Sequence, residues 1–326
     1  MKNNPKIQLN DGAGGADSDK FFSAIRNKFP HFGNWQKQSD DAAVYKLGGK
    51  KLVFTTDSYT ITPLFFRGGD IGKLAICGTI NDLAVMGAQP LGIALSLIIE
   101  EGLARRDLDR IMRSVASISK REGVPIVTGD TKVMEAGKID KLVINTSGVG
   151  TADTVIANAG LRAGQVLLVS GSIGDHGGTI LAHRFDYDTS LKSDCQSIWQ
   201  PIKSVKKYLT AAKDPTRGGP AAVLNEMAEK SKVKIIINEK AVPVRKETVG
   251  LADILGVSVY DLACEGRFVA GVSAPQAAAV LKKLQRFDKQ AAIIGEVVSG
   301  RGVFIKNNYG LRPLRPGIGK LVPRIC

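Results

Sequence analysis

The chain has 326 residues, 44% of them hydrophobic, and a formal net charge of +14. This length exceeds the usual single hydrophobic core, so two domains are expected. No apolar signal region opens the chain and the longest apolar runs, such as 91–99, are of strand length, which predicts a cytoplasmic protein without a membrane span. The basic residues are dispersed and aromatic residues make up only 6%, which argues against nucleic-acid binding and favours phosphorylated small molecules or an acidic partner protein.

The cysteines predict reduced thiols and one unusual chain end. They are far apart and show no CxxC spacing, which argues against a zinc site and a disulfide framework. Cys326 is the last residue and carries both a thiol and a carboxylate. From Asn308 onward the chain is rich in glycine and proline and contains no acid, so we interpret 308–326 as a flexible tether with an extended reach on the order of 60 Å. An incidental terminal cysteine is the alternative.

Acidic residues recur through the first half of the chain. A glycine-rich stretch at 11–15 precedes a predicted helix at 18–28, and could cradle phosphate or be a plain loop. Asp41 lies in an acidic turn, and a strand at 52–56 is expected to place Asp57 at its end. A solvated acidic turn explains one such residue but explains their recurrence less well, and paired acids suit Mg²⁺.

Two further sets of polar residues follow. The apolar helix expected at 74–86 carries Asn81 and Asp82, and a charge inside such a helix is costly unless it is paired or metal-bound. After a buried strand at 91–99 and an amphipathic helix at 107–121, a short strand at 124–127 is expected to end in Thr128, Gly129, Asp130, Thr131 and Lys132. A strand at 142–148 completes an α+β half.

A turn-rich linker at 159–164 marks the expected domain boundary. The predicted units are an N-terminal domain at 1–155, a C-terminal domain at 156–307 and the tail at 308–326. The second domain is expected to hold strands at 166–169, 234–237, 268–272 and 291–297, and helices ending at 184 and spanning 194–209, 221–230, 248–255 and 276–284. His176 is interpreted mainly as a packing residue. Burial beside apolar neighbours would raise the pKa of Glu265 and suit it to proton transfer.

Several motifs together resemble a known family. They are Ser39-Asp40-Asp41-Ala42-Ala43, Thr55-Thr56-Asp57-Ser58, the run Gly78 to Ala88, Thr128-Gly129-Asp130-Thr131-Lys132, Asp214-Pro215-Thr216-Arg217-Gly218-Gly219 and the terminal Pro-Arg-Ile-Cys. Over essentially the whole chain they resemble the HypE family of hydrogenase maturation factors. The internal motifs are shared with aminoimidazole ribonucleotide synthetase, selenophosphate synthetase and thiamine-monophosphate kinase, whereas the tail is specific to HypE. Asn10-Asp11 stand where the family often has His-Gly.

The resemblance implies a fold and an activity. The expected fold is α+β, with two domains like those of aminoimidazole ribonucleotide synthetase, ATP between them and a homodimer formed through the N-terminal halves. The partner HypF is expected to carbamoylate Cys326. ATP would then drive dehydration of the thiocarbamate to a protein thiocyanate, whose cyanide passes to iron on HypC–HypD for [NiFe]-hydrogenase.

The resemblance also implies roles for individual residues. Metal and phosphate binding is assigned to Asp41, Asp57, Asp82 and Asp130, with Thr56, Asn81, Gly129, Asp214, Thr216 and Gly218 joining them at the nucleotide. Lys132 and Glu265 are candidates for the proton transfers, in either order, and Cys326 is the carrier. Two rivals stay open: an enzyme of the same superfamily with a soluble substrate, and a non-enzymatic thiol-bearing scaffold.

Overall fold

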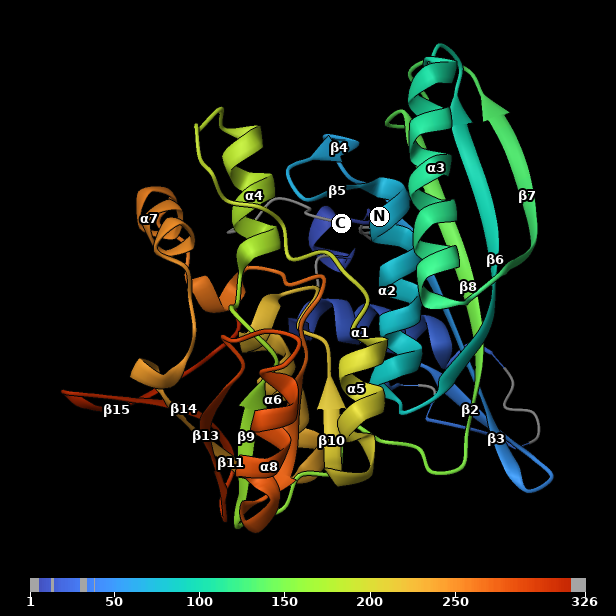
Figure 1. Cartoon of the computed structure of the whole chain (residues 1–326). Helices are drawn as coiled ribbons and strands as arrows, with labels where there is room; N and C mark the ends of the chain where they lie inside the picture. The colour runs from blue at the N-terminus through green and yellow to red at the C-terminus, as the bar shows by residue number, and fades with distance from the viewer. Residues whose placement is uncertain (1–5, 13–14, 30–33, 38, 318–326) are drawn as a thin grey trace, which may run out of the picture.

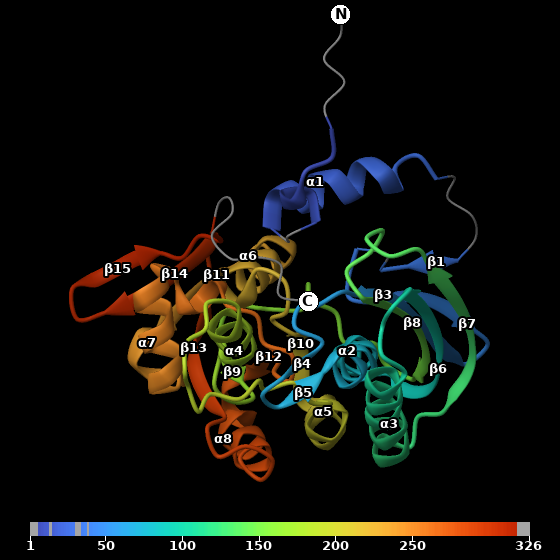
Figure 2. The same ribbon diagram turned by 90° about the horizontal axis from the view of Figure 1, so that it is seen from above.

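The computed structural model describes residues 6–12, 15–29, 34–37 and 39–317. The predicted carrier Cys326, with the last part of the predicted tail, lies outside the described residues. Within them, two mixed β-sheets are covered by helices and stand side by side (Figures 1 and 2). The described residues contain no helix long and apolar enough to cross a membrane.

The first sheet is built from the first half of the chain. Its strands in spatial order are β1 (Trp35–Gln36), β2 (Ala43–Leu47), β3 (Lys50–Tyr59), β8 (Leu142–Ala152), β6 (Gln89–Glu100) and β7 (Ile126–Met134). Neighbours are antiparallel except β6 and β7, which run parallel. Helices α2 (Ile71–Val85) and α3 (Arg105–Glu122) lie over one face of this sheet (Figure 2).

The second sheet is built from the second half. Its strands in spatial order are β10 (Leu209–Lys213), β12 (Val269–Ser273), β9 (Gln165–Val169), β13 (Ala292–Val298), β11 (Lys234–Asn238), β14 (Gly302–Asn307) and β15 (Gly310–Pro313). The helices of this half are α4 (Asp175–Arg184), α5 (Trp199–Val205), α6 (Gly219–Ser231), α7 (Lys246–Leu255) and α8 (Ala274–Leu284). Helix α1 (Gly15–Arg26) precedes the first sheet, and β4 (Phe65–Phe66) pairs with β5 (Gly69–Asp70) ahead of α2.

Helix α2 is the centre of the molecule. The Asp70 side chain caps it by accepting the Lys73 N–H at 2.9 Å, which satisfies a free donor of the first turn. Nearly all of its residues are buried, and its apolar side chains share one continuous core with Trp199 and Ile202 of α5 and with Phe268. Because one core spans both sheets, the two halves are held together by hydrophobic burial as well as by polar contacts.

Four expectations from the sequence are corrected here. Asp57 lies inside β3 and Asp130 inside β7, because the neighbouring strands keep pairing beyond the predicted strand ends. The helix expected at 194–209 is irregular until α5 begins at Trp199. The start of the predicted tether is ordered, since 310–313 form an edge strand and the Leu314 side chain is buried.

Candidate active site

Carboxylates from both halves of the chain gather between the two sheets. The members of this carboxylate cluster are Asp41, Asp57, Asp82, Asp214 and Glu265, and each either raises the pKa of another member or has its own pKa raised by one. Burial is the largest cause of the raised pKa in every case. The first three come from the first half and the last two from the second, so the chemistry of the cluster depends on how the halves are joined.

Asp57 and Asp82 meet on the inner face of the first sheet. In β3 the side chains alternate, so Asp57 points inward with Thr55 and Tyr59. Asp82 Oδ2 accepts a hydrogen bond from Thr55 Oγ1 at 2.7 Å, and Asp57 Oδ2 accepts one from Tyr59 Oη at 3.2 Å. The pKa of Asp82 is raised well above its usual value by burial and then by the charge of Asp57. Two carboxylates held this way favour a bound cation.

Asp41 links the first half to the second through an ion pair. Its Oδ1 pairs with Lys213 Nζ at the end of β10. Glu226 of α6 lies 3.5 Å from the same ammonium group, and Lys230 joins Glu226 at 2.8 Å and Asp40 at 3.2 Å. Burial raises the pKa of Asp41, and the Lys213 charge opposes that rise. Lys213 is a site residue that the sequence analysis missed, although it directly precedes the Asp214 motif.

Asp214 and Glu265 close the cluster from the second half. Burial and the charge of Asp41 raise the pKa of Asp214 to about 7. The side chain of Glu265 is buried, and its pKa is raised well above the usual value by burial and then by Asp214. Arg217 lowers the pKa of both Glu265 and Asp57, which places its guanidinium near the cluster. This arginine lies inside the 214–219 motif, but no role was predicted for it from the sequence.

The motif around Asp214 forms a tight turn at the start of α6. Thr216 N–H donates to the Asp214 carbonyl at 3.1 Å, and Gly219 N–H donates to the Thr216 carbonyl at 3.0 Å. Gly218 and Gly219 both have left-handed backbone angles, with φ of 73° and 61°. A Cβ at Gly219 would also lie 2.6 Å from the Tyr260 carbonyl oxygen, so both glycines are required here. Backbone N–H groups at such a turn suit phosphate oxygens.

The cluster has the properties of a divalent cation site that is completed by substrate. Asp41 Oδ2, Asp214 Oδ2 and Glu265 Oε1 are buried and have no hydrogen-bond partner among the described residues. Such orphaned oxygens fit a hard cation. No three acidic, histidine or cysteine side chains of the described residues are close enough to hold an ion alone. Mg²⁺ usually takes few protein ligands and shares substrate phosphates.

Thr56, Asp130 and Lys132 lie on the opposite face of the first sheet. Thr56 is exposed and receives a hydrogen bond from Ser147 Oγ at 3.0 Å. Cross-strand register places Thr56 in line with Thr128, and Asp130 two residues further along β7. Asp130 forms an exposed ion pair with Lys132 at 3.4 Å, which lowers its pKa together with the Thr131 backbone N–H. Within one chain, Gly129, Asp130 and Lys132 therefore do not join the cluster.

The side chain of Asn81 forms its hydrogen bonds within the protein. It is 1% exposed, and its side-chain Nδ2 donates to the carbonyls of Gln196 at 3.1 Å and Glu265 at 3.3 Å. Its Oδ1 accepts the Ile198 N–H at 2.8 Å. Both ends of the amide are therefore used within the protein, and the contact of Asn81 with nucleotide stays a prediction.

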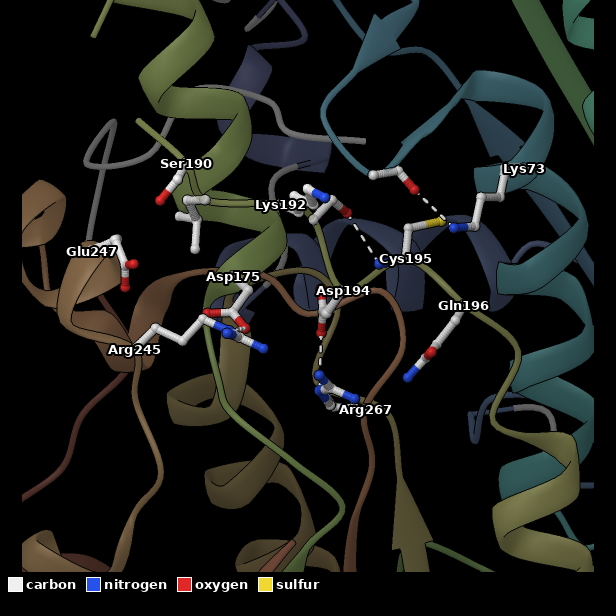
Figure 3. A pocket seen from close by; sticks show the side chains of 13 residues that line it. Lys73, Asp175, Ser190, Lys192, Asp194, Cys195, Gln196, Arg245, Glu247 and Arg267 are labelled. Carbon is white, nitrogen blue, oxygen red and sulfur yellow. Dashed lines mark hydrogen bonds and ion pairs between the residues drawn. The ribbon is translucent and has the colours of Figure 1, made fainter. Parts of the chain in front are cut away.

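A cavity of about 530 Å³ adjoins the segment that Asn81 holds. Residues 190–196 line it, together with Lys73, Asp175, Arg245 and Arg267. Figure 3 shows Asp194 above Arg267, to which it is joined at 3.6 Å, and Arg245 beside Asp175, 2.9 Å away. Burial raises the pKa of Asp194 to about 6, and the Arg267 charge opposes that rise.

Comparison with known proteins identifies the family. Residues 39–152 match AIR synthase related protein, N-terminal domain, and residues 162–307 match AIR synthase related protein, C-terminal domain. The carbamoyl dehydratase HypE of Escherichia coli is 41% identical over 335 residues, which cover 98% of this chain and 99% of that protein. This chain belongs to the HypE family.

Solved HypE structures share the fold described above. A chain of a HypE–HypF complex superposes with a TM-score of 0.85 at 37% identity, covering 91% of this chain and 99% of that one. A HypE in complex with ATP gives a TM-score of 0.82 at 36% identity, covering 98% of this chain and 100% of that one. The predicted two-domain fold of the aminoimidazole ribonucleotide synthetase type is therefore confirmed.

Proposed function

We propose that this chain uses ATP to dehydrate a carbamoyl group on its own Cys326 to a thiocyanate, which supplies cyanide to the iron of [NiFe]-hydrogenase. The observation that carries the proposal is a buried Glu265, whose Oε1 has no hydrogen-bond partner among the described residues, beside carboxylates suited to Mg²⁺. It is found in a chain 41% identical to a carbamoyl dehydratase over 98% of this chain and 99% of that protein. The match to a HypE solved with ATP supports ATP as the co-substrate.

The reaction needs an activated oxygen and two proton acceptors. The carboxamide oxygen attacks the γ-phosphorus of ATP, which forms a C–O–P linkage and releases ADP. Loss of the first N–H proton gives an imidic phosphate, R–S–C(=NH)–OPO₃²⁻. Loss of the second N–H proton forms the C≡N bond as the C–O bond breaks and phosphate leaves. The protein must therefore position phosphates and accept protons more than it must form covalent bonds itself.

Glu265 is suited to the proton transfers. A carboxyl group with a raised pKa accepts protons more readily at neutral pH than an ordinary one. The positive charge of Arg217 lowers the pKa of Glu265 and so favours its ionised form. Glu265 can therefore accept a proton when ATP and the carbamoyl group are bound. When bound, Mg²⁺ would be held by one or two carboxylates of the set Asp41, Asp57, Asp82 and Asp214 together with the ATP phosphates, whose charge it would neutralise. The same set fits Mg²⁺ better than a set that includes the distant Asp130.

A second copy of the chain would bring Lys132 and Asp130 into use. The outer face of the first sheet presents Trp35, Phe54 and Thr56 as exposed side chains, and no helix of the described residues covers it, in contrast to the inner face under α2. We propose that two copies associate through this face as a homodimer. In that arrangement Lys132 would serve the partner's site, where it would hold the carboxamide or accept a proton.

The remaining partners follow from the chemistry. HypF, found with HypE in a solved complex, would place the carbamoyl group on Cys326, and HypC–HypD would receive the cyanide. Both steps require ATP-containing, reducing surroundings, and we therefore place them in the cytoplasm.

The proposed domain division is 1–155 and 156–307, with a shorter tether than the sequence predicted. The final hydrogen bond of the described chain joins Gly317 N–H to Asp261 Oδ1 at 3.1 Å. The nine residues 318–326 that follow can reach about 30 Å when extended. That length is enough for Cys326 to visit different sites on one or two proteins.

Intact mass spectrometry tests the proposed function. After incubation with HypF, carbamoyl phosphate and ATP, the chain is expected to gain about 43 Da and then to lose about 18 Da. The loss should require ATP and should be absent from Cys326→Ala. Consumption of ATP with no mass change on Cys326 would support an enzyme with a soluble substrate, whereas no ATP consumption at all would support a thiol-bearing scaffold.

A further inference from the structure

Asn81 joins the carboxylate cluster to the segment that carries Glu265. It precedes Asp82 in α2, but its side chain points to the second half of the molecule rather than to the cluster. Its three hydrogen bonds, at 2.8–3.3 Å, all go to backbone groups: the carbonyls of Gln196 and Glu265 and the N–H of Ile198. At 1% exposure, these bonds are shielded from water and their loss would leave buried polar groups unpaired.

The Glu265 backbone is held on both sides. Its carbonyl accepts from Asn81 and from the Gln196 N–H at 3.3 Å, and its own N–H donates to Asp194 Oδ1 at 3.1 Å. Gly266 allows this close approach, because a Cβ there would overlap the Asp194 carbonyl oxygen. The Glu265 side chain itself has a buried Oε1 without a hydrogen-bond partner in the described part of the chain, so the backbone contacts determine where the carboxyl group lies.

The segment 186–198, which contacts Glu265 through Asp194 and Gln196, would be poorly restrained without the hydrogen bonds of Asn81. Residues 186–198 form neither helix nor strand, and residues 190–196 border the cavity of about 530 Å³ (Figure 3). A stretch without secondary structure that faces open space can shift at little cost. Asn81 ties this stretch to α2, the most thoroughly buried helix of the molecule.

We propose that Asn81 is a positioning residue that fixes Glu265 relative to Asp82. Two adjacent residues of α2 then fix the positions of the proton acceptor and of the nucleotide-binding carboxylates. This role rests on the proposed dehydration. It is an alternative to the predicted contact between Asn81 and nucleotide, and it gives a reason for an amide at this position. The amide supplies two donors to carbonyls and one acceptor to an N–H, whereas Asp at the same position would supply no donor.

The test follows the dehydration of carbamoylated Cys326 by mass in single turnover, over a range of ATP concentrations. Asn81→Ala and Asn81→Asp are each expected to lower the rate at saturating ATP by about 10- to 100-fold, with the half-saturating ATP concentration unchanged. Gln165→Ala is the matched control. Gln165 is also a buried amide whose Oε1 accepts two hydrogen bonds, but it lies at the start of β9 and its donors, Arg162 N–H and Thr210 Oγ1, are outside the cluster.

A double variant separates positioning from a general structural role. If Asn81 acts through Glu265, then Asn81→Ala is expected to change the residual rate of Glu265→Gln by less than about threefold. Amide hydrogen exchange is the second measurement, and remains informative if an Asn81 variant is inactive for other reasons. Exchange at 262–268 should be faster in Asn81→Ser than in the wild-type chain and unchanged in Gln165→Ala.

The outcomes against the proposal are distinct from failure of the proposed function. A wild-type chain that does not dehydrate Cys326 would refute the function itself. With an active wild type, a raised half-saturating ATP concentration at an unchanged maximal rate would make Asn81 a nucleotide ligand after all. The positioning role would likewise be overturned if Asn81→Ala lowered the dehydration rate by the same factor in the Glu265→Gln and wild-type backgrounds. Unchanged amide exchange at 262–268 in Asn81→Ser would overturn it too.

Discussion

Glu265 and the cluster around it show how burial sets chemistry at the residue scale. A carboxyl group removed from water and placed near other acids holds its proton more strongly, and nearby cations reverse that effect. Glu265 experiences both influences, from Asp214 and from Arg217. The identity of the neighbours therefore matters more for its function than the residue type alone.

Replacing Glu265 with Gln tests its role as a proton acceptor. The amide keeps the size of the side chain but cannot accept a proton, so the dehydration rate is expected to fall by about 100-fold or more, with ATP binding retained. The measurement is mass loss from carbamoylated Cys326, with nucleotide binding followed separately. Glu247→Gln, at an exposed residue on the rim of the cavity, is the control. A rate near that of the wild type would remove Glu265 from the reaction.

Asp194 provides a pH-dependent stability test. Burial raises its pKa from 3.8 to about 6, so the folded chain binds this proton more tightly than the unfolded chain. The resulting stabilisation is present below about pH 4 and is lost as the pH rises through about 6. Relative to Asp194→Asn, the free energy of unfolding of the wild type is expected to fall by up to about 3 kcal/mol between about pH 4 and 7.

Urea denaturation at several pH values measures this difference. Asp188→Asn, whose parent side chain is fully exposed, controls for removal of one negative charge. If the free energies of unfolding of the wild type and Asp194→Asn differ by the same amount at every pH, burial does not raise the pKa of Asp194.

At the scale of elements, the sequence predicted helices better than strand ends. The apolar run of α2 and the amphipathic pattern of α3 predicted both helices to within a few residues. Strands β3 and β7 were predicted too short, because Asp, Ser, Thr and Lys look like turn residues although β8 and β6 continue to pair with them. Strands β14 and β15 were missed because glycine and proline obscured the alternation.

The same error bears on how the predicted site residues are arranged. They were expected in one site, and of them Asp41, Asp57, Asp82, Asp214 and Glu265 converge in the structure. Thr56 and Asp130 do not, because alternation along a strand sends neighbouring side chains to opposite faces. A strand that continues through Asp57 already requires Thr56 to point away. Lys213 and the role of Asn81 depend on contacts between the halves, which no local pattern shows.

The outer face of the first sheet predicts an oligomer. Phe54→Glu places a charge on this face at a side chain that is 41% exposed, and is expected to convert a dimer into a monomer because a buried unpaired charge is costly. Light scattering during size-exclusion chromatography measures the mass. Phe287→Glu, 51% exposed and beyond α8 in the second half, is the control. If both variants match the wild-type mass, the proposed interface is wrong.

Mixing two inactive variants tests whether Lys132 acts on the partner's site. In a mixed dimer of Lys132→Ala and Glu265→Gln, one site carries both substitutions and the other carries neither. Subunit exchange should then restore up to about a quarter of the wild-type rate. Activity that stays at the level of the separate variants would mean that Lys132 serves the chain that carries it.

At the scale of the whole molecule, the carboxylate cluster is assembled from both halves around α2, and Cys326 comes nine residues after Gly317, the last described residue. The shared core fixes the halves, and the ion pairs of Lys213 and Lys230 connect the loop at 39–41 to β10 and α6. Such a molecule is suited to bringing its own terminus to a rigid site as substrate.

The most direct measurement follows the carboxamide oxygen. Carbamoyl phosphate labelled with oxygen-18 at the carbonyl is used with HypF to load Cys326, and ATP is then added. Phosphorylation of the carboxamide predicts that the released phosphate carries the label. The labelled chain should then lose about 20 Da, compared with about 18 Da for an unlabelled chain. Unlabelled phosphate together with labelled water, or phosphate release without mass loss, would contradict an ATP-dependent dehydration of Cys326.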